Sequence, residues 1–220
     1  MKTCSGLFLV TEKAKTKPVT PLAARFRGYL PVVLDIETAG FNAQTDAILE
    51  ITAVILGMDG DEQLLPETTH SYHVKPFEGA NLDAASLKFT GINPHHPLRI
   101  AHPEKDVFTD MFKHIRHKMK SEACSRAILV AHNAHFDHGF IRAATERHNL
   151  KRNPFHPFSS IDTVSLSALS FGQTVLSRAC EAAGLDFDDA QAHSARYDAE
   201  KTADLFCHIV NRWKNLGGWP

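Results

Sequence analysis

Apolar residues along the chain gather in short runs, and the first three of these runs predict strands. They cover residues 29–36, 47–56 and 70–77, and polar stretches separate them. The connections between the runs are too short for helical crossovers, so we expect an antiparallel three-strand meander.

A helical stripe follows the meander and introduces a second pattern. Its apolar residues recur every three or four positions, namely Phe108, Met111, Phe112, Ile115 and Met119. Residues 127–131 read AILVA, which is typical of a strand covered on both faces. A helix from about residue 136, a strand over 160–164 and two helices after residue 173, divided near Gly184, complete the order. The pattern predicts an α/β fold with a mixed central sheet and flanking helices.

Length and composition favour one domain. The chain has 220 residues and 43% hydrophobic content, enough for the core of a single α/β domain, which we place at 25–220. Residues 11–24 hold three lysines and two prolines, so 1–24 is expected to be a flexible arm. Lysines follow the short apolar start instead of a cleavage site, which argues against a signal peptide. No apolar stretch approaches the roughly 18 residues that span a bilayer, so we expect a soluble protein.

Charge and cysteine content narrow the class only slightly. Lys and Arg number 24 against 25 Asp and Glu, so any nucleic-acid footprint must be local. The four cysteines form no CxxC pair, which speaks against a disulfide framework or a structural zinc site. Reduced thiols are typical of the cytoplasm, which is the predicted location.

Acidic residues stand at three places where the predicted elements begin or end. Asp35 and Glu37 are two apart at the end of a strand, so both carboxylates project from one face. Asp137 follows the buried 127–131 strand, and His193 precedes Asp198 near a helix start. Each feature alone has an ordinary structural explanation, because strand ends and first helical turns commonly carry solvated acids.

The combination of these residues indicates a metal-dependent hydrolase. Four carboxylates from separate elements and one imidazole are the set that a two-metal phosphodiesterase requires. Hard Mg²⁺ or Mn²⁺ would bind the carboxylate oxygens. His193 would accept the proton of the attacking water, since imidazole titrates near neutral pH.

The segments VVLDIETAGF, ILVAHNAHFD and HSARYD resemble the motifs of the DEDD exonucleases, in the branch with a catalytic histidine. The resemblance covers residues 25–220, and strings such as GQTVLSRAC and NRWKNLGGWP extend it to the RNA-trimming members of that branch. It implies a ribonuclease H-like exonuclease fold and a homodimer. It also implies that Asp35, Glu37, Asp137 and Asp198 hold two Mg²⁺, with Mn²⁺ as a substitute, and that His193 is the general base.

The same resemblance implies an activity and a substrate. The activity is 3′-to-5′ trimming of transfer RNA and other stable RNAs, which releases nucleoside monophosphates, and single-stranded DNA is accepted too. Four phenylalanines match positions that stack on terminal bases: Phe41, Phe89, Phe136 and Phe158. Five basic residues match a nucleic-acid-binding patch: Arg25, Arg27, Lys120, Arg126 and Lys151. Phenylalanine is also a common core residue, and a basic run is often only a solvated helix face.

Two departures from the family pattern concern the substrate. The lysine-rich arm before Arg25 is longer than the family predicts and could add nonspecific RNA affinity. Ala85 stands where an acidic residue is expected to contact a terminal base, so a base preference is not transferred.

Other functions share some of these residues. Oligoribonucleases and proofreading-type DNA exonucleases have the acids and the histidine but lack the basic and terminal strings. A noncatalytic RNA-binding protein on the same fold would not need the intact acids. A zinc protein that uses several of the 14 histidines lacks HExxH and any Cys/His cluster of the usual spacing.

Overall fold

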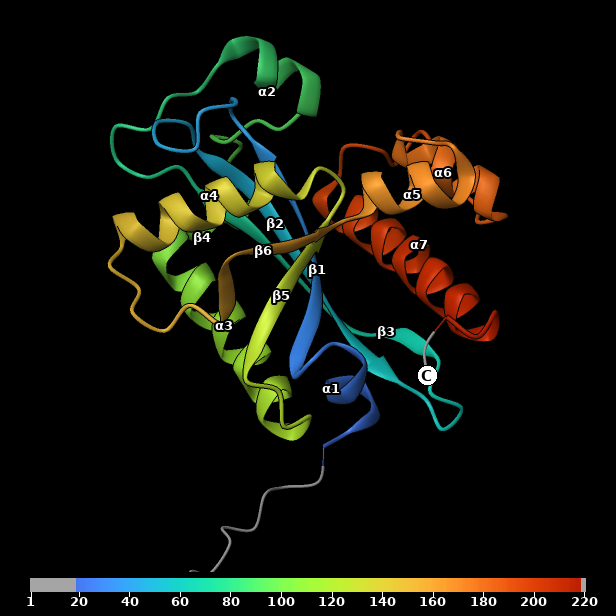
Figure 1. The fold of residues 1–220 in the computed structure, drawn as a ribbon. Coiled ribbons are helices and arrows are strands. Elements are labelled where there is room, and N and C mark those ends of the chain that lie inside the picture. Colours follow the sequence, from blue (N-terminus) through green and yellow to red (C-terminus); the bar gives the residue numbers. More distant parts are fainter. Residues whose placement is uncertain (1–18, 219–220) are drawn as a thin grey trace, which may run out of the picture.

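The computed structural model describes residues 19–218, which form one mixed sheet with helices packed on it (Figure 1). The six strands lie in the order β4-β3-β2-β1-β5-β6. In chain order the elements are α1 (Pro21–Arg25), β1 (Tyr29–Thr38), β2 (Ile48–Met58), β3 (Leu64–Lys75), α2 (Ala84–Thr90), β4 (His102–Pro103), α3 (Glu104–Ser121), β5 (Arg126–Ala131), α4 (Ala134–Arg147), β6 (Phe155–Asp162), α5 (Thr163–Phe171), α6 (Leu176–Ala183) and α7 (Ala195–Asn215).

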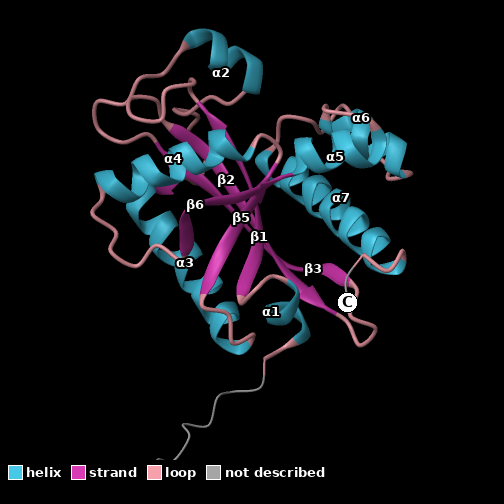
Figure 2. Ribbon diagram, viewed as in Figure 1, coloured by secondary structure: helices cyan, strands magenta, loops and turns pink. Residues whose placement is uncertain are grey.

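The predicted meander is confirmed. β1 pairs antiparallel with β2, and β2 pairs antiparallel with β3. β5 lies parallel to β1 on its other side, and β6 lies parallel to β5, which makes the sheet mixed. Figure 2 shows these strands crossing the middle of the molecule with the helices around them.

Helices cover both faces of the sheet, and the core lies between the layers (Figure 1). β1 is buried along almost its whole length because α3 and α4 cover one of its faces and α7 the other. The stripe predicted for α3 is buried at Phe108, Met111, Phe112 and Ile115, while Met119 is only partly buried. Within residues 19–218, no helix is long and apolar enough to cross a membrane.

A short helix begins the described part of the chain. The boundary predicted between residues 24 and 25 falls inside α1, whose Leu22 joins the main core. Thr20 begins this helix, because its hydroxyl accepts a hydrogen bond from the backbone N–H of Ala23 at 3.2 Å. Residues 1–18, which include most of the predicted arm and the apolar start, lie outside the described residues.

Several elements differ from their predicted bounds for local reasons. The strand predicted over 160–164 is β6, which begins at Phe155 and ends at Asp162. Thr163 and Val164 instead begin α5, because the Asp162 side chain accepts a hydrogen bond from the Val164 N–H at 2.8 Å. α2 was not predicted, since it buries no residue and therefore has no apolar stripe. β3 begins earlier than predicted, at Leu64, because the exposed residues 66–68 interrupt the apolar pattern after Leu64 and Leu65.

Candidate active site

The central strand β1 delivers two carboxylates to the end of the sheet. Asp35 and Glu37 lie on the same face of β1, opposite Thr52 and Glu50 of β2. Glu37 is buried and Asp35 is half-buried. Covering helices therefore hold both acids away from most of the solvent.

The third acid comes from the first turn of α4. Asp137 is only 4% exposed, and α4 starts directly after the buried strand β5. The Asp162 carboxylate at the end of β6 accepts the backbone N–H of Asn133 at 3.3 Å and that of Ala134 at 3.0 Å. Asp162 therefore fixes the start of the helix that carries Asp137.

Asp198 and His193 come from the last connection and the start of α7. Asp198 lies in the first turn of α7, and its Oδ2 accepts the backbone N–H of His193 at 3.0 Å. Its Oδ1 is buried and has no hydrogen-bond partner among the described residues. His193 is exposed and holds a left-handed backbone conformation with φ 66°.

These residues converge at one place. One ligand atom each from Glu37, His193 and Asp198 lies within 4.8 Å of the others. Burial, followed by the charges of Asp137, Glu37 and other carboxylates, raises the pKa of Asp35 well above its usual value. The structure thus brings together all five residues of the predicted catalytic set.

Burial raises the pKa of several carboxylates in the cluster, and their mutual repulsion adds to the effect. Burial, together with neighbouring carboxylates, raises the pKa of Glu37 to about 8. Burial likewise raises the pKa of Asp137 and that of Asp198. Carboxylates that repel one another, and an Oδ1 of Asp198 without a donor among the described residues, are the features expected of a site for divalent cations.

Three of the four predicted phenylalanines surround a pocket beside Glu37. The pocket has a volume of about 400 Å³, and Phe41, Phe89 and Phe136 line it together with Ala85. Phe41 is 86% exposed and Phe89 is 68% exposed, so their rings are available to a ligand. The Phe89 ring also lies 4.4 Å from the His193 ring, measured between centroids.

Phe158 lies elsewhere, on the edge strand β6. It is 81% exposed and is not among the residues that line this pocket. Its ring contacts His156 at 4.5 Å between centroids, and His156 in turn lies 5.6 Å from Tyr29. Phe158 is thus connected to the opposite end of β1, where the basic residues lie.

The predicted basic residues come from several elements: Arg27 precedes β1, Lys120 lies in the last turn of α3, and Lys151 lies in the loop between α4 and β6. Arg126 pairs with Tyr29 across the two strands, and its guanidinium donates to the Asn153 carbonyl at 3.4 Å, next to Lys151. Arg27, Lys120, Arg126 and Lys151 are all exposed.

Arg25 differs from the expectation for the patch. Its side chain is only 6% exposed and is directed to Glu62, with an ion pair at 3.6 Å and a hydrogen bond to the carbonyl at 3.0 Å. The patch presented to solvent therefore consists of the other four residues.

Sequence reasoning missed two acids beside the site. Asp162 precedes a helix start, and a capping signal could have revealed it. Glu50 lies opposite Glu37 in the pairing of β1 with β2, and its Oε1 lies 3.0 Å from Nδ1 of His73. No motif marks Glu50, because its position follows only from the strand register.

This fold with acids at the end of its central strand is that of an exonuclease, and comparison with known families agrees. Residues 32–206 match the family model described as Exonuclease, so the chain belongs to this family. Within it, the chain is similar to Ribonuclease T of Hahella chejuensis, with 60% identity over 94% of this chain and 95% of that protein. It is likewise 61% identical to Ribonuclease T of an Enterobacter species, over 92% of this chain and 90% of that protein. The family predicted from the motifs is confirmed.

Solved structures support the fold. Exonuclease I of E. coli in complex with a dT13 oligonucleotide superposes with a TM-score of 0.65 at 16% identity. The superposition covers 86% of this chain but only 43% of exonuclease I, so the chain spans less than half of that protein. The same enzyme has been solved in a zinc-bound form with single-stranded DNA, with a TM-score of 0.63. The expected ribonuclease H-like exonuclease fold is confirmed.

Proposed function

We propose that this protein is a 3′-to-5′ exonuclease that trims RNA ends by two-metal-ion hydrolysis and releases nucleoside monophosphates. The observation that carries the proposal is the convergence of Asp35, Glu37, Asp137, Asp198 and His193 beside an aromatic pocket. The pocket would accommodate a terminal base. Glu37 is one of the residues that line it, so the acid cluster lies beside the bound base. This arrangement suits hydrolysis of the last phosphodiester bond of an RNA strand.

The four carboxylates fit a pair of divalent cations. The donors are hard oxygens, which Mg²⁺ prefers, and Mn²⁺ can substitute for it. We assign Asp35, Glu37, Asp137 and Asp198 as the residues that hold two Mg²⁺. When bound, such a pair lowers the pKa of a water and stabilises charge on the leaving oxygen.

His193 is the proposed general base. It is exposed at the mouth of the site, and its backbone is tied to Asp198 by the 3.0 Å hydrogen bond. Its ring lies against Phe89, which keeps it close to the place where a terminal base would stack. The imidazole can therefore take a proton from a water beside the acids.

The aromatic residues would contribute binding affinity that does not depend on base identity. Stacking of a base on an aromatic ring contributes about 1 to 3 kcal/mol and tolerates every base. We propose that Phe41, Phe89 and Phe136 hold the last base. Phe158, on the path toward the basic residues, would meet a nucleotide further from the end.

The basic residues are too far from the acids to act in the same subunit. Arg27 and Asp35 are eight residues apart, and extended chain of that length spans about 26 Å. We propose a twofold homodimer that places Arg27, Lys120, Arg126 and Lys151 opposite the partner's acids. Closed isologous dimers are the commonest oligomers, and such a patch would bind RNA through its phosphates.

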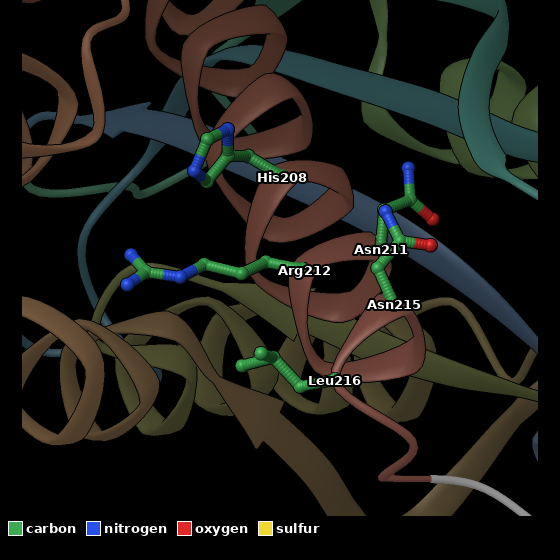
Figure 3. A pocket seen from close by; sticks show the side chains of 5 residues that line it. All are labelled: His208, Asn211, Arg212, Asn215 and Leu216. Carbon is green, nitrogen blue, oxygen red and sulfur yellow. The ribbon is translucent and has the colours of Figure 1, made fainter.

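An exposed apolar surface supports this homodimer. A hollow of about 550 Å³ between α5 and α7 is lined by Leu166, Leu169, Ile209, Trp213 and Leu216. Figure 3 shows the adjoining hollow of about 350 Å³, where His208 and Arg212 project from one side of α7 and Leu216 follows one turn later. Lys214 of this helix end donates to the Asp61 carbonyl at 2.5 Å, in the same turn that pairs with Arg25. The surface therefore lies beside the basic end of the molecule.

The names of the relatives support a substrate, and the cysteines support a location. Relatives named Ribonuclease T support RNA, and a fold relative solved with single-stranded DNA supports DNA as a second substrate. We propose transfer RNA and other stable RNAs as the natural targets. Cys124, Cys180 and Cys207 are free among the described residues, which suits the reducing cytoplasm that we propose as the location.

The test uses RNAs of several lengths labelled at either end, incubated with Mg²⁺ or with EDTA. We expect a 5′-labelled RNA to shorten stepwise, a 3′-labelled RNA to release labelled mononucleotide at once, and EDTA to stop both. Asp137→Asn is the matched inactive control. Internal fragments, or cleavage that persists in EDTA, would contradict the proposal. Activity confined to RNAs of a few nucleotides would instead indicate an oligoribonuclease.

A further inference from the structure

A buried carboxylate outside the acid cluster organises the loop that presents Phe41. Asp46 lies between β1 and β2 and is only 5% exposed. Its carboxylate accepts hydrogen bonds from the backbone N–H of Asn42 at 2.9 Å and from the Thr45 hydroxyl at 2.8 Å. It also accepts one from the Asn81 side-chain amide at 3.0 Å. The carboxylate thus joins the loop 39–47 to a segment far along the chain.

The segment that Asp46 reaches leads directly into α2. Asn81 forms a parallel bridge with Asp46, and its N–H donates to the Thr45 carbonyl at 2.8 Å. Two residues later, the Asp83 N–H donates to the Ala39 carbonyl at 2.8 Å, and the Asp83 side chain caps α2 by accepting from the Ser86 N–H. One continuous network therefore connects the loop of Phe41 to the helix of Phe89.

Gly40 shows how closely the loop fits this carboxylate. A Cβ at residue 40 would overlap Oδ2 of Asp46, so any side chain there would displace the carboxylate or the loop. The Thr38 hydroxyl donates to the Gly40 carbonyl at 2.6 Å, which fixes the other side of the same residue. The backbone immediately before Phe41 thus has the Asp46 carboxylate close on one side and a hydrogen bond on the other.

Packing alone does not hold the two rings. Phe41 is 86% exposed, and its ring contact is with Phe136, edge-on at 6.2 Å. Phe89 is 68% exposed on a helix that buries no residue. Rings with so little buried area gain little from the hydrophobic effect, so their separation depends on the backbone that carries them.

We infer that Asp46 is a positioning residue for substrate recognition: through Asn81 it sets the separation of Phe41 and Phe89, and hence the width of the slot for the terminal base. The inference rests on the proposed function, in which these rings stack on that base. Asp46 itself touches neither the substrate nor the metal ligands in this arrangement.

Asp46→Asn tests the inference with little change of shape. The remaining oxygen of an asparagine can still accept the hydrogen bond from the Asn81 amide. The other oxygen is replaced by an NH₂ group, which cannot accept the hydrogen bond from the Asn42 N–H. Asp59→Asn is the matched control, because Asp59 holds the β2–β3 turn by accepting the N–H groups of Asp61 and Gln63 at 2.9 and 2.8 Å. Both aspartates organise a turn, but only Asp46 connects to α2.

The readout compares two short single-stranded RNAs, one ordinary and one whose 3′-terminal nucleotide lacks its base. We expect the wild-type protein and Asp59→Asn to have a KM about tenfold lower for the ordinary RNA. Asp46→Asn should lose most of this difference while kcat on the ordinary RNA stays within about threefold. Asp46→Asn combined with Phe41→Ala should be no worse than Phe41→Ala alone. Thermal unfolding of each variant confirms that it is folded.

The outcomes separate this inference from the proposed function. If Asp46→Asn still discriminates between the two RNAs as the wild type does, Asp46 does not set the slot. Equal losses on both RNAs would show a merely structural role and overturn the inference as well. If the wild type does not discriminate, the stacking role of the rings fails, and the inference falls with it.

Discussion

The backbone N–H of His193 donates a hydrogen bond of 3.0 Å to the Oδ2 of Asp198, so the backbone that carries the imidazole is tied to the last carboxylate of the site. The bond spans the first turn of α7 and holds His193 in its left-handed conformation. It uses one oxygen of Asp198 and leaves Oδ1 for another partner. The backbone of the proposed base is therefore held beside a proposed metal ligand.

Asp198→Asn should abolish nearly all hydrolysis while the fold is retained. The amide keeps the size of the side chain but removes the charge that a cation needs. Residues that merely orient metal ligands already contribute about 10- to 100-fold, so a direct ligand should contribute more than about 100-fold. Single-turnover cleavage in saturating Mg²⁺ measures the loss, and Asp137→Asn should behave alike. Turnover near the wild-type rate would refute the metal assignment.

His193→Ala should reduce the rate at least about 100-fold while RNA binding survives, as expected on removal of a general base. His193→Asn is the matched variant, because asparagine tolerates the left-handed backbone at this position better than alanine does. Both should lose activity to a similar extent and show the circular dichroism of the wild type. If the asparagine variant is active and only the alanine variant unfolds, His193 is a structural residue.

Metal-free protein should become less stable as the pH rises. The pKa of Glu37 is about 8 in the folded protein against an ordinary 4.5, so the folded state binds this proton more tightly than the unfolded state. The contribution to stability is therefore present below about pH 4.5 and is lost as the pH rises toward 8. The Tm in EDTA should fall between pH 6 and 8.5, by about 2 to 4 °C for each kcal/mol lost.

Divalent cations should oppose this loss, because they bind the deprotonated carboxylates and binding releases protons. With saturating Mg²⁺ the Tm at pH 8.5 should exceed that in EDTA by more than it does at pH 6. Glu37→Gln should remove much of the pH dependence in EDTA. A Tm in EDTA that rises over this pH range would show that the acids are not forced together.

Phe41→Ala and Phe89→Ala should each raise KM for short single-stranded RNA by about tenfold, which is the loss of roughly one stacked base. Their affinity for Mg²⁺ should be unchanged, as measured by calorimetry. Phe158→Ala is the comparison, since Phe158 does not line the pocket and should matter less for very short RNAs. An unchanged KM for the first two variants would make both rings ordinary surface residues.

A mixture of two inactive proteins tests the homodimer. One carries Asp137→Asn with its basic residues intact, and the other has Arg27, Lys120, Arg126 and Lys151 changed to Ala. After subunit exchange, each heterodimer has one intact acid cluster that faces one intact patch, so activity on structured RNA should return. Arg25 stays unchanged, because its side chain already pairs with Glu62. If mass measurement finds heterodimers but the mixture stays inactive, the patch does not serve the partner.

The strands of the sheet were predictable where burial determines the sequence. β1 and β5 are covered on both faces, and their runs of apolar residues predicted them within two residues at either end. α2 buries no residue, and residues 66–68 of β3 are exposed, so no continuous apolar pattern marks either segment. α5 has little amphipathic character, and the β-branched Thr163 and Val164 at its start are typical of a strand.

The acids of the site could be predicted because the chemistry dictates residue types at element ends. Their convergence, and the presence of Glu50 beside them, depends on strand register and helix placement that the sequence pattern does not contain. The same holds for Phe158 and Arg25. Their residue types suit nucleic acid, but tertiary contacts direct the Phe158 ring to His156 and the Arg25 side chain to Glu62.

The position of Glu50 bears on the order in which divalent cations and RNA bind. It stands across from Glu37 and adds a fifth carboxylate near the four proposed metal ligands. Before any cation arrives, an RNA phosphate that approaches this place meets a group of carboxylates, and each ionised one repels it. Cations are drawn in by the same field. In the proposed mechanism we therefore expect metal to bind before the scissile phosphate does. An RNA end that enters the aromatic slot of a metal-free molecule would then be held by its base alone.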